Sequence, residues 1–339
     1  MRRSEQQGEE AGVLAFMRPV LTFLALALLA VTMVPASDRT ADQAAGPSHP
    51  LVIAHRGASG LLPEHSLPAY LLGMEQGADY IEPDLVMTRD GHLVVRHDIY
   101  LSTTTNVADL PRFRDRKRTF EGREDWFVFD FTLKELRGLR VRQPRPERGQ
   151  GHDGRYPVMT LWEVIAAVAA YDRPVGVYPE IKRPDLFISL GLDPTEPLLA
   201  ALDVVESLGL PVYVQSFNGP YLRRLAEAGV KPLVLNVYRR EDGTISTPIA
   251  PYADVVDAIG ADKRLLFDDD GTSDFLARAH DLGLDVHAWT IRDDDVPARF
   301  DSVQAELSAL FAMGVDGVFA DFPATVRTVP GRISGERAP

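Results

Sequence analysis

Short apolar runs alternate with helical segments from Leu51 onward, and this alternation limits the possible folds more than any other feature. Strands that alternate with helices pair in parallel through right-handed crossovers. Eight such units predict a closed (β/α)₈ barrel, the TIM barrel. The eight expected strands are Leu51–Ala54, Asp79–Leu85, Val175–Ile181, Val212–Gln215, Pro232–Val237, Asp254–Ile259, Asp285–Trp289 and Gly317–Ala320.

Helix ends support this pattern. Thr132 and Thr160 each precede a glutamate by three residues, the spacing of a capping box. A doubly wound parallel sheet is the alternative fold, but the glycine fingerprint of dinucleotide-binding sheets is missing from the sequence. The barrel is therefore the favoured architecture.

A long segment, residues 101–156, interrupts the alternation after the second strand. A short strand at Leu93–Arg96 precedes it and is expected to form a hairpin with the second strand. A connection of this length must carry its own packing or be disordered. Its aromatic residues favour packing, so an inserted subdomain over the barrel mouth is expected within a domain that spans residues 51–329. These aromatics are Phe113, Phe120, Trp126, Phe127, Phe129 and Phe131.

The N-terminus has the features of an export signal. Arg18 precedes an apolar run from Val20 to Val34, and a small-residue cleavage pattern ends at Ala36. Residues 1–36 are thus expected to be a signal peptide, with Met17 as a possible alternative start. An uncleaved membrane anchor stays open, because the apolar run is near the lower limit for spanning a bilayer. The expected location is periplasmic or extracellular.

Polar, small residues 37–50 are expected to form a linker, and residues 330–339 a flexible tail. The net charge of −13 argues against nucleic acid as a partner. The chain has no cysteine, which excludes disulfides, zinc–thiolate sites and a thiol nucleophile.

Three carboxylates are candidate metal ligands. Glu82 and Asp84 are two residues apart on an expected strand, so they project to the same side. Apolar neighbours on that strand favour burial, where paired carboxylates repel unless a cation or a proton separates them. Glu180, at the end of the third strand, would add a third oxygen. Oxygen donors without thiolates select a divalent cation such as Ca²⁺, the preferred candidate, or Mg²⁺.

Two histidines are candidate catalytic residues. His55 directly follows the first strand, on the barrel rim where active sites of this fold lie. His97 follows the hairpin strand. Two histidines at one anionic site can act as general base and general acid near neutral pH. His65 and His92 are interpreted as structural.

Further polar residues follow the expected strands. Arg56 and Lys182 could donate to a phosphodiester oxygen, although either could instead pair with the carboxylates. Gln215 and Trp289 are candidates for substrate binding at strand ends. Asn236 and Asp321 are weaker candidates for the pocket wall.

Several motifs together resemble the glycerophosphodiester phosphodiesterase family, in particular its exported branch with a long insertion. They are His55-Arg56-Gly57, the segment PEHSLPAY from Pro63, Glu82-Pro83-Asp84, the segment MTRDGHLVVRHD from Met87, and Tyr178-Pro179-Glu180-Ile181-Lys182. The resemblance covers residues 51–323. It implies a TIM barrel, a cation held by the three carboxylates, and His55 and His97 as the acid–base pair. It also implies substrate contact by Arg56 and Lys182.

The implied reaction converts glycerophosphodiesters, such as glycerophosphocholine or glycerophosphoethanolamine, to sn-glycerol 3-phosphate and an alcohol. Family precedent suggests attack by the glycerol 2-hydroxyl through a cyclic phosphate, with direct attack by water as the alternative. The partner would be a small molecule, with membrane contact only through an uncleaved leader.

Two alternative functions stay open. A lipid-cleaving relative on the same barrel would need an exposed apolar lip, which the aromatic insertion could supply. An exported binding protein for a phosphorylated ligand would not need two histidines. A glycosidase fits poorly, because its carboxylates should flank the sugar rather than lie two apart on one strand.

Overall fold

The computed structural model describes residues 49–268 and 271–331. The expected signal peptide, all but two residues of the linker and the last eight residues of the tail lie outside this range. Those expectations therefore stay predictions. The chain divides into two units, residues 1–46 and 47–339, and everything below concerns the second unit.

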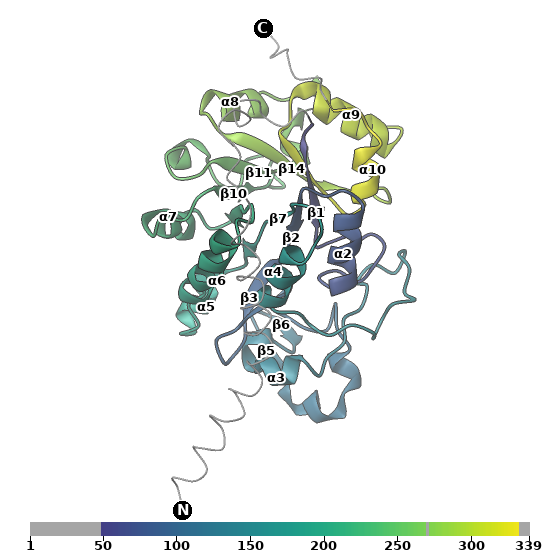
Figure 1. The fold of residues 1–339 in the computed structure, drawn as a ribbon, viewed down its shortest axis with the longest axis vertical. Helices are drawn as coiled ribbons and strands as arrows, with labels where there is room; N and C mark the ends of the chain where they lie inside the picture. Colours follow the sequence, from purple (N-terminus) through teal and green to yellow (C-terminus); the bar gives the residue numbers. More distant parts are fainter. Residues whose placement is uncertain (1–48, 269–270, 332–339) are drawn as a thin grey trace, which may run out of the picture. The chain divides into compact units, whose positions relative to one another are not determined.

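Eight strand positions in the described residues close into a parallel barrel, which confirms the expected fold class (Figure 1). β15 pairs with β1, β1 with β2, and β8 with β9, so the ring has no open edge among these strands. The strands are β1 (Leu51–His55), β2 and β3 (Tyr80–Glu82 and Asp84–Met87), β7 and β8 (Gly176–Val177 and Glu180–Ile181), β9 (Val214–Ser216), β10 (Leu233–Val237), β11 (Ala258–Asp262), β14 (Asp285–Ile291) and β15 (Gly317–Ala320).

Prolines divide the second and third barrel strands. Pro83 separates β2 from β3, and Pro179 separates β7 from β8. Proline has no N–H to donate to the ladder, so strand pairing is interrupted there. The two halves stay in register, since β2 pairs with β7 and β3 pairs with β8. The interruptions lie beside the candidate metal ligands.

One expected strand was misplaced. The prediction for the sixth strand was Asp254–Ile259, whereas β11 runs from Ala258 to Asp262. The N–H groups of Val255 and Val256 both donate to the carbonyl of Tyr252, so this segment turns before the strand begins. The expected hairpin is present, with β4 (Leu93–Val95) antiparallel to β3.

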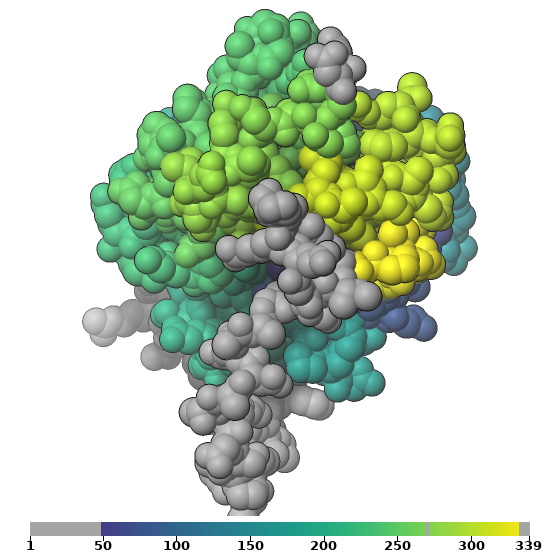
Figure 2. Space-filling model, turned by 90° about the horizontal axis from the view of Figure 1, so that it is seen from above, coloured from purple at the N-terminus to yellow at the C-terminus, as the bar shows by residue number. Residues whose placement is uncertain are grey.

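Helices cover the outside of the barrel, and Figure 1 shows α7, α8 and α9 outside β10, β11 and β14. Figure 2 shows the C-terminal segments, in yellow, packed beside the green segments that contain β10 to β14. Both expected capping boxes are present, at Thr132 and Thr160. None of the helices in the described ranges is long and apolar enough to cross a membrane. The helices are α2 (Leu67–Glu75), α3 (Leu133–Leu136), α4 (Leu161–Ala169), α5 (Pro184–Ser189), α6 (Thr195–Ser207), α7 (Gly219–Glu227), α8 (Phe275–Asp281), α9 (Val303–Met313) and α10 (Pro323–Arg327).

The insertion folds around its own aromatic residues. It contains the hairpin of β5 (Arg118–Phe120) and β6 (Arg123–Asp125), three short 3₁₀ helices and α3. Phe127 and Phe129 stack with ring centroids 5.5 Å apart, and Phe129 also meets Phe187 of α5 edge-on. The aromatic cluster therefore joins the insertion to the barrel, and it does not line the pocket described below.

Replacing Phe129 by alanine is expected to destabilise the protein by ~3–5 kcal/mol, the usual cost of truncating a buried phenylalanine. The KM should stay near that of the wild type, because Phe129 lies outside the pocket. Urea unfolding and steady-state kinetics on the same preparations test both parts. A raised KM without loss of stability would instead place Phe129 at the substrate.

The barrel interior holds a buried histidine. His287 on β14 is fully buried, and its Nδ1 lies 2.8 Å from the hydroxyl of Tyr178. Tyr213 packs edge-on against the His287 ring, and Asp316 is the charged group that acts on it. Burial lowers the pKa of His287 to about 4, so the ring is neutral in the folded protein at neutral pH.

This histidine predicts a loss of stability in acid. Because its folded pKa lies below the unfolded value of about 6.5, the unfolded chain binds the proton first as pH falls. Between about pH 7.5 and about pH 5, His287 should cost about 2 kcal/mol of unfolding free energy. His287→Gln should remove that part of the pH dependence, which urea unfolding at the two pH values measures. An identical pH dependence in wild type and variant would contradict the buried neutral histidine.

Candidate active site

One cavity opens at the carboxyl ends of the barrel strands. Its open volume, including the mouth, is about 450 Å³. Ten of the eleven residues that the sequence indicated for the site or its wall line it, and their roles remain predictions. The exception is Asp321, which was expected in the wall and is not among the lining residues. The lining residues are His55, Arg56, Glu82, Asp84, His97, Glu180, Lys182, Gln215, Phe217, Asn236, Trp289, Thr290, Arg292 and Phe319.

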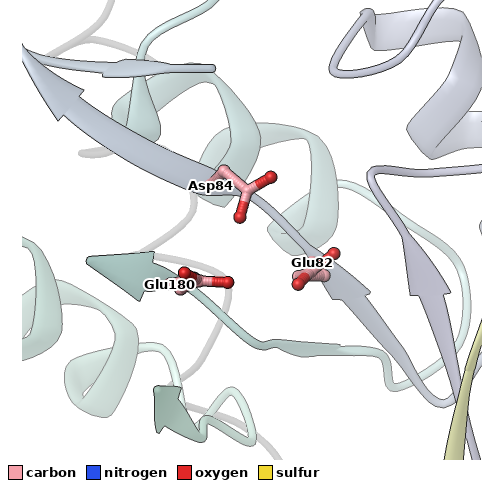
Figure 3. A group of neighbouring side chains, drawn as sticks. All are labelled: Glu82, Asp84 and Glu180. Atoms are coloured by element: carbon pink, nitrogen blue, oxygen red, sulfur yellow. The ribbon is translucent and has the colours of Figure 1, made fainter. Parts of the chain in front are cut away.

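Three buried carboxylates converge on this cavity (Figure 3). Glu82 ends β2, Asp84 begins β3 and Glu180 begins β8, so the proline breaks in both strands lie next to them. One oxygen from each lies within 4.8 Å of the others. All three are at most 4% exposed, so bulk water does not screen their mutual repulsion.

The closeness and burial of the three carboxylates shift their pKa values. Burial and the charges of Asp84 and Glu180 raise the pKa of Glu82 well above its ordinary value. Burial, opposed in part by Lys182, raises the pKa of Glu180 to about 7. Burial also acts to raise the pKa of Asp84, but Lys182 and a hydrogen bond from His65 outweigh it and hold that pKa well below normal.

The charge balance fits a divalent cation. Four carboxylates meet two basic side chains here, so a divalent ion would bring these groups to neutrality if all were ionised. The donor set consists of hard oxygens alone, which suits Ca²⁺ or Mg²⁺. The acidic side chains are Glu64, Glu82, Asp84 and Glu180, and the basic ones are Arg56 and Lys182.

His55 is held by a carboxylate from the last barrel strand. Its Nδ1 donates to Oδ1 of Asp321 at 2.5 Å, and its Nε2 faces Oε2 of Glu82 at 3.9 Å. Burial and the neighbouring Arg56 charge lower the pKa of His55 to about 4, although Asp321 opposes the shift. A neutral ring with Nδ1 protonated leaves Nε2 free to accept a proton.

His97 is held in the same way by its own neighbour in sequence. Its Nδ1 donates to Oδ1 of Asp98 at 2.7 Å, and its side chain is partly exposed. Burial and the charges of Arg56 and Lys182 lower the pKa of His97. The cavity thus receives two histidines, each oriented by a carboxylate on Nδ1.

The loop after β1 presents Arg56. The Arg56 N–H donates to Glu82, and its side chain meets Glu64 at 3.0 Å and Asp84 at 3.3 Å. Gly57 has a φ of +84°, and a Cβ there would lie 2.6 Å from the backbone of Ala69 in α2. Glycine therefore lets this loop lie directly on α2.

Lys182 also pairs with the carboxylates. Its Nζ lies 2.7 Å from Glu180 and 3.7 Å from Asp84. The pairing with carboxylates that the sequence left open for Arg56 and Lys182 is thus present. Both side chains still line the cavity, so an anionic substrate could meet them as well.

An amide chain supports Glu82 from the next strands. Asn236 Nδ2 donates to Gln215 at 2.9 Å, and Gln215 Nε2 donates to Glu82 at 2.8 Å. Gln215 therefore holds a candidate metal ligand besides lining the cavity. Trp289 meets Phe217 edge-on, with ring centroids 5.8 Å apart.

Several contributors were missed from the sequence. His65, interpreted as structural, donates from Nε2 to Asp84 at 3.0 Å and so orients a site carboxylate. Asp98 could have been found from its position directly after His97. Phe217 and Arg292 also line the cavity, but no sequence signal marks them. His92 lies outside the cavity, half exposed and near Asp90.

A barrel whose mouth holds an acidic triad, two carboxylate-held histidines and two basic residues defines a class, the hydrolases of anionic esters. The chain matches the Glycerophosphoryl diester phosphodiesterase family over residues 55–325. A glycerophosphodiester phosphodiesterase of Arabidopsis thaliana is 31% identical, covering 82% of this chain and 85% of the relative. Another, from Haemophilus influenzae, is 30% identical over 90% and 97% of the two chains.

Solved structures show the same fold. A glycerophosphoryl diester phosphodiesterase from Silicibacter pomeroyi superimposes with a TM-score of 0.64 at 24% identity, over 84% of this chain and 94% of that one. A phosphodiesterase from Oleispira antarctica, in complex with its product sn-glycerol-3-phosphate, gives 0.58 at 24% identity over 83% and 96%. The chain belongs to the glycerophosphoryl diester phosphodiesterase family, and it is a phosphoric diester hydrolase.

Proposed function

We propose that this enzyme requires a divalent cation and hydrolyses glycerophosphodiesters, such as glycerophosphocholine or glycerophosphoethanolamine, to sn-glycerol 3-phosphate and the free alcohol. One observation carries the proposal: the acidic triad lies in the same cavity as two histidines whose Nδ1 atoms are each fixed by a carboxylate. Simple binding of a phosphorylated ligand needs no such pair.

The reaction breaks the bond between phosphorus and the oxygen of the departing alcohol. Water supplies the hydroxyl that phosphorus gains and the proton that the alcohol gains, whether in one step or through a cyclic phosphate. One of His55 and His97 accepts a proton from the attacking hydroxyl, and the other donates one to the departing oxygen. Arg56 and Lys182 bind the phosphoryl oxygens, where charge develops.

The carboxylates Glu82, Asp84 and Glu180 would hold the cation, which supplies electrostatic stabilisation of the phosphoryl group when bound. Ca²⁺ is the preferred ion and Mg²⁺ the alternative, since both take oxygen ligands.

Substrate choice tests this proposal. Purified enzyme with Ca²⁺ is incubated in parallel with glycerophosphocholine and with phosphatidylcholine vesicles, and released choline is measured. Rapid release from glycerophosphocholine and little from vesicles is expected. Preference for the vesicles would instead favour the lipid-cleaving relative, for which the exposed Phe217 and Tyr238 could provide an apolar contact.

We also propose that the chain is exported, with residues 1–36 removed. Deleting residues 1–36 should leave a soluble enzyme with unchanged kcat, because every barrel element begins at or after Leu51. Expression of both forms, fractionation and kinetics check this. An insoluble truncated protein beside a full-length protein that needs detergent would favour the membrane anchor.

A further inference from the structure

Arg148 reaches from the insertion to the buried carboxylate that holds His55. Its guanidinium Nη2 donates to Oδ2 of Asp321 at 2.6 Å, and its side chain is only 4% exposed. Nε and Nη2 also form a fork on Asp294, at 2.7 Å and 3.0 Å. Nη1 donates to the carbonyl of Ser59 at 3.2 Å. All three nitrogens of this buried cation therefore have partners, as such burial requires.

The two carboxylate oxygens of Asp321 accept hydrogen bonds from different residues. Oδ1 accepts from His55, whereas Oδ2 accepts from Arg148 and from Arg292 Nε at 3.0 Å. A carboxylate held on one oxygen by two guanidinium groups cannot rotate freely. The plane of Asp321, and with it the orientation of the His55 ring, is therefore fixed by Arg148 from outside the cavity and by Arg292, which lines it.

The same part of the insertion also braces the loop after His55. Gln143 Nε2 donates to the carbonyls of Ser59 and Leu62, at 3.0 Å and 3.3 Å. Ser59 in turn donates from its hydroxyl to the His55 carbonyl at 2.8 Å. Residues 143–148 thus contact both the side-chain partner of His55 and the backbone that follows it.

We propose that Arg148 is a positioning residue, through which the insertion completes the active site by fixing the Asp321–His55 pair. Arg148 does not line the cavity, so it acts through Asp321 and not on the substrate. The inference rests on the proposed acid–base role of His55. It assigns the insertion a part in the chemical step, separate from the packing of its aromatic cluster.

Steady-state kinetics of Arg148→Ala, Arg148→Lys and the control Arg145→Ala test the inference. Arg145 lies in the same segment, is partly exposed and pairs with Glu147. Arg148→Ala should lower kcat ~10–100-fold, the usual effect of removing a partner that orients an active-site ligand. The KM should change less than about twofold, because binding contacts are unaffected. Lysine should restore part of kcat, and the control should match the wild type.

The same substitution in the His55→Ala enzyme shows whether Arg148 acts through His55. Adding Arg148→Ala to His55→Ala should cause no further loss, since residues that act as a unit are not additive. An equal loss in both backgrounds would overturn the inference, and so would a folded Arg148→Ala enzyme with kcat within twofold of wild type. If His55→Ala itself keeps full activity, the proposed function fails instead.

If Arg148→Ala does not fold, the variant Asp294→Asn provides a second test. Asp294 is partly exposed, and its change loosens the guanidinium without touching Asp321. A smaller loss of kcat with unchanged KM is expected. Unchanged kcat in Asp294→Asn together with an unfolded Arg148→Ala would count against positioning and in favour of a purely structural role.

Discussion

Replacing His55 or His97 by alanine is expected to lower kcat by ~10²–10⁴, the contribution of a general acid or base. Each ring is fixed at Nδ1 by an aspartate, so each can present Nε2 to the reacting oxygens. Alanine removes the group that moves the proton, whichever of the two routes the reaction takes. The KM should change less than kcat, because Arg56 and Lys182 remain to bind the phosphate.

His92→Ala is the matched control for both variants. His92 lies in the same sequence motif as His97 but outside the cavity, and its side chain is half exposed. The control should keep wild-type kcat and KM. Wild-type kcat in either His55→Ala or His97→Ala, with circular dichroism showing an intact fold, would remove that histidine from the mechanism.

Removal of divalent cations is expected to abolish turnover, and Ca²⁺ or Mg²⁺ should restore it. The reason is the repulsion among three buried carboxylates, which together with burial raises the pKa values of Glu82 and Glu180. Calorimetric titration of the metal-free protein should show one ion bound per chain. Glu82→Gln should weaken that binding at least ~10-fold, since the site loses a charged ligand.

Glu75→Gln is the control for the metal titration, because Glu75 is an exposed residue of α2 away from the cavity. Its metal affinity should equal that of the wild type. Full activity after dialysis against excess chelator, with metal removal verified by elemental analysis, would exclude the carboxylate triad as an essential metal site.

The barrel could be predicted because the sequence features that specify each strand and helix lie within that element or next to it. Each strand is a short apolar run, and each helix has caps that lie within a few residues of it. The strand bounds that were predicted wrongly depend on backbone hydrogen bonding. Pro83 and Pro179 divide strands that the apolar pattern presents as continuous, and the turn at Tyr252 delays β11 by four residues.

Site residues were predictable where topology alone brings them together. Residues at the carboxyl ends of parallel barrel strands meet at one mouth, so His55, Glu82 and Glu180 could be grouped from their positions. The hydrogen-bond partners of these site residues could not be predicted, because they depend on side-chain geometry. His55 and Asp321 were both expected at strand ends, but the hydrogen bond that joins them across 266 residues was not predicted, and Arg148 comes from an insertion with no periodic pattern. Only the folded structure shows that these three are connected.

The position of bond cleavage tests the central claim most directly. Glycerophosphocholine is incubated with the Ca²⁺-loaded enzyme, and the products are identified by phosphorus nuclear magnetic resonance. We expect sn-glycerol 3-phosphate as the final phosphorus-containing product, in amounts equal to the choline released. Phosphocholine with free glycerol, or no turnover with either Ca²⁺ or Mg²⁺, would contradict the account.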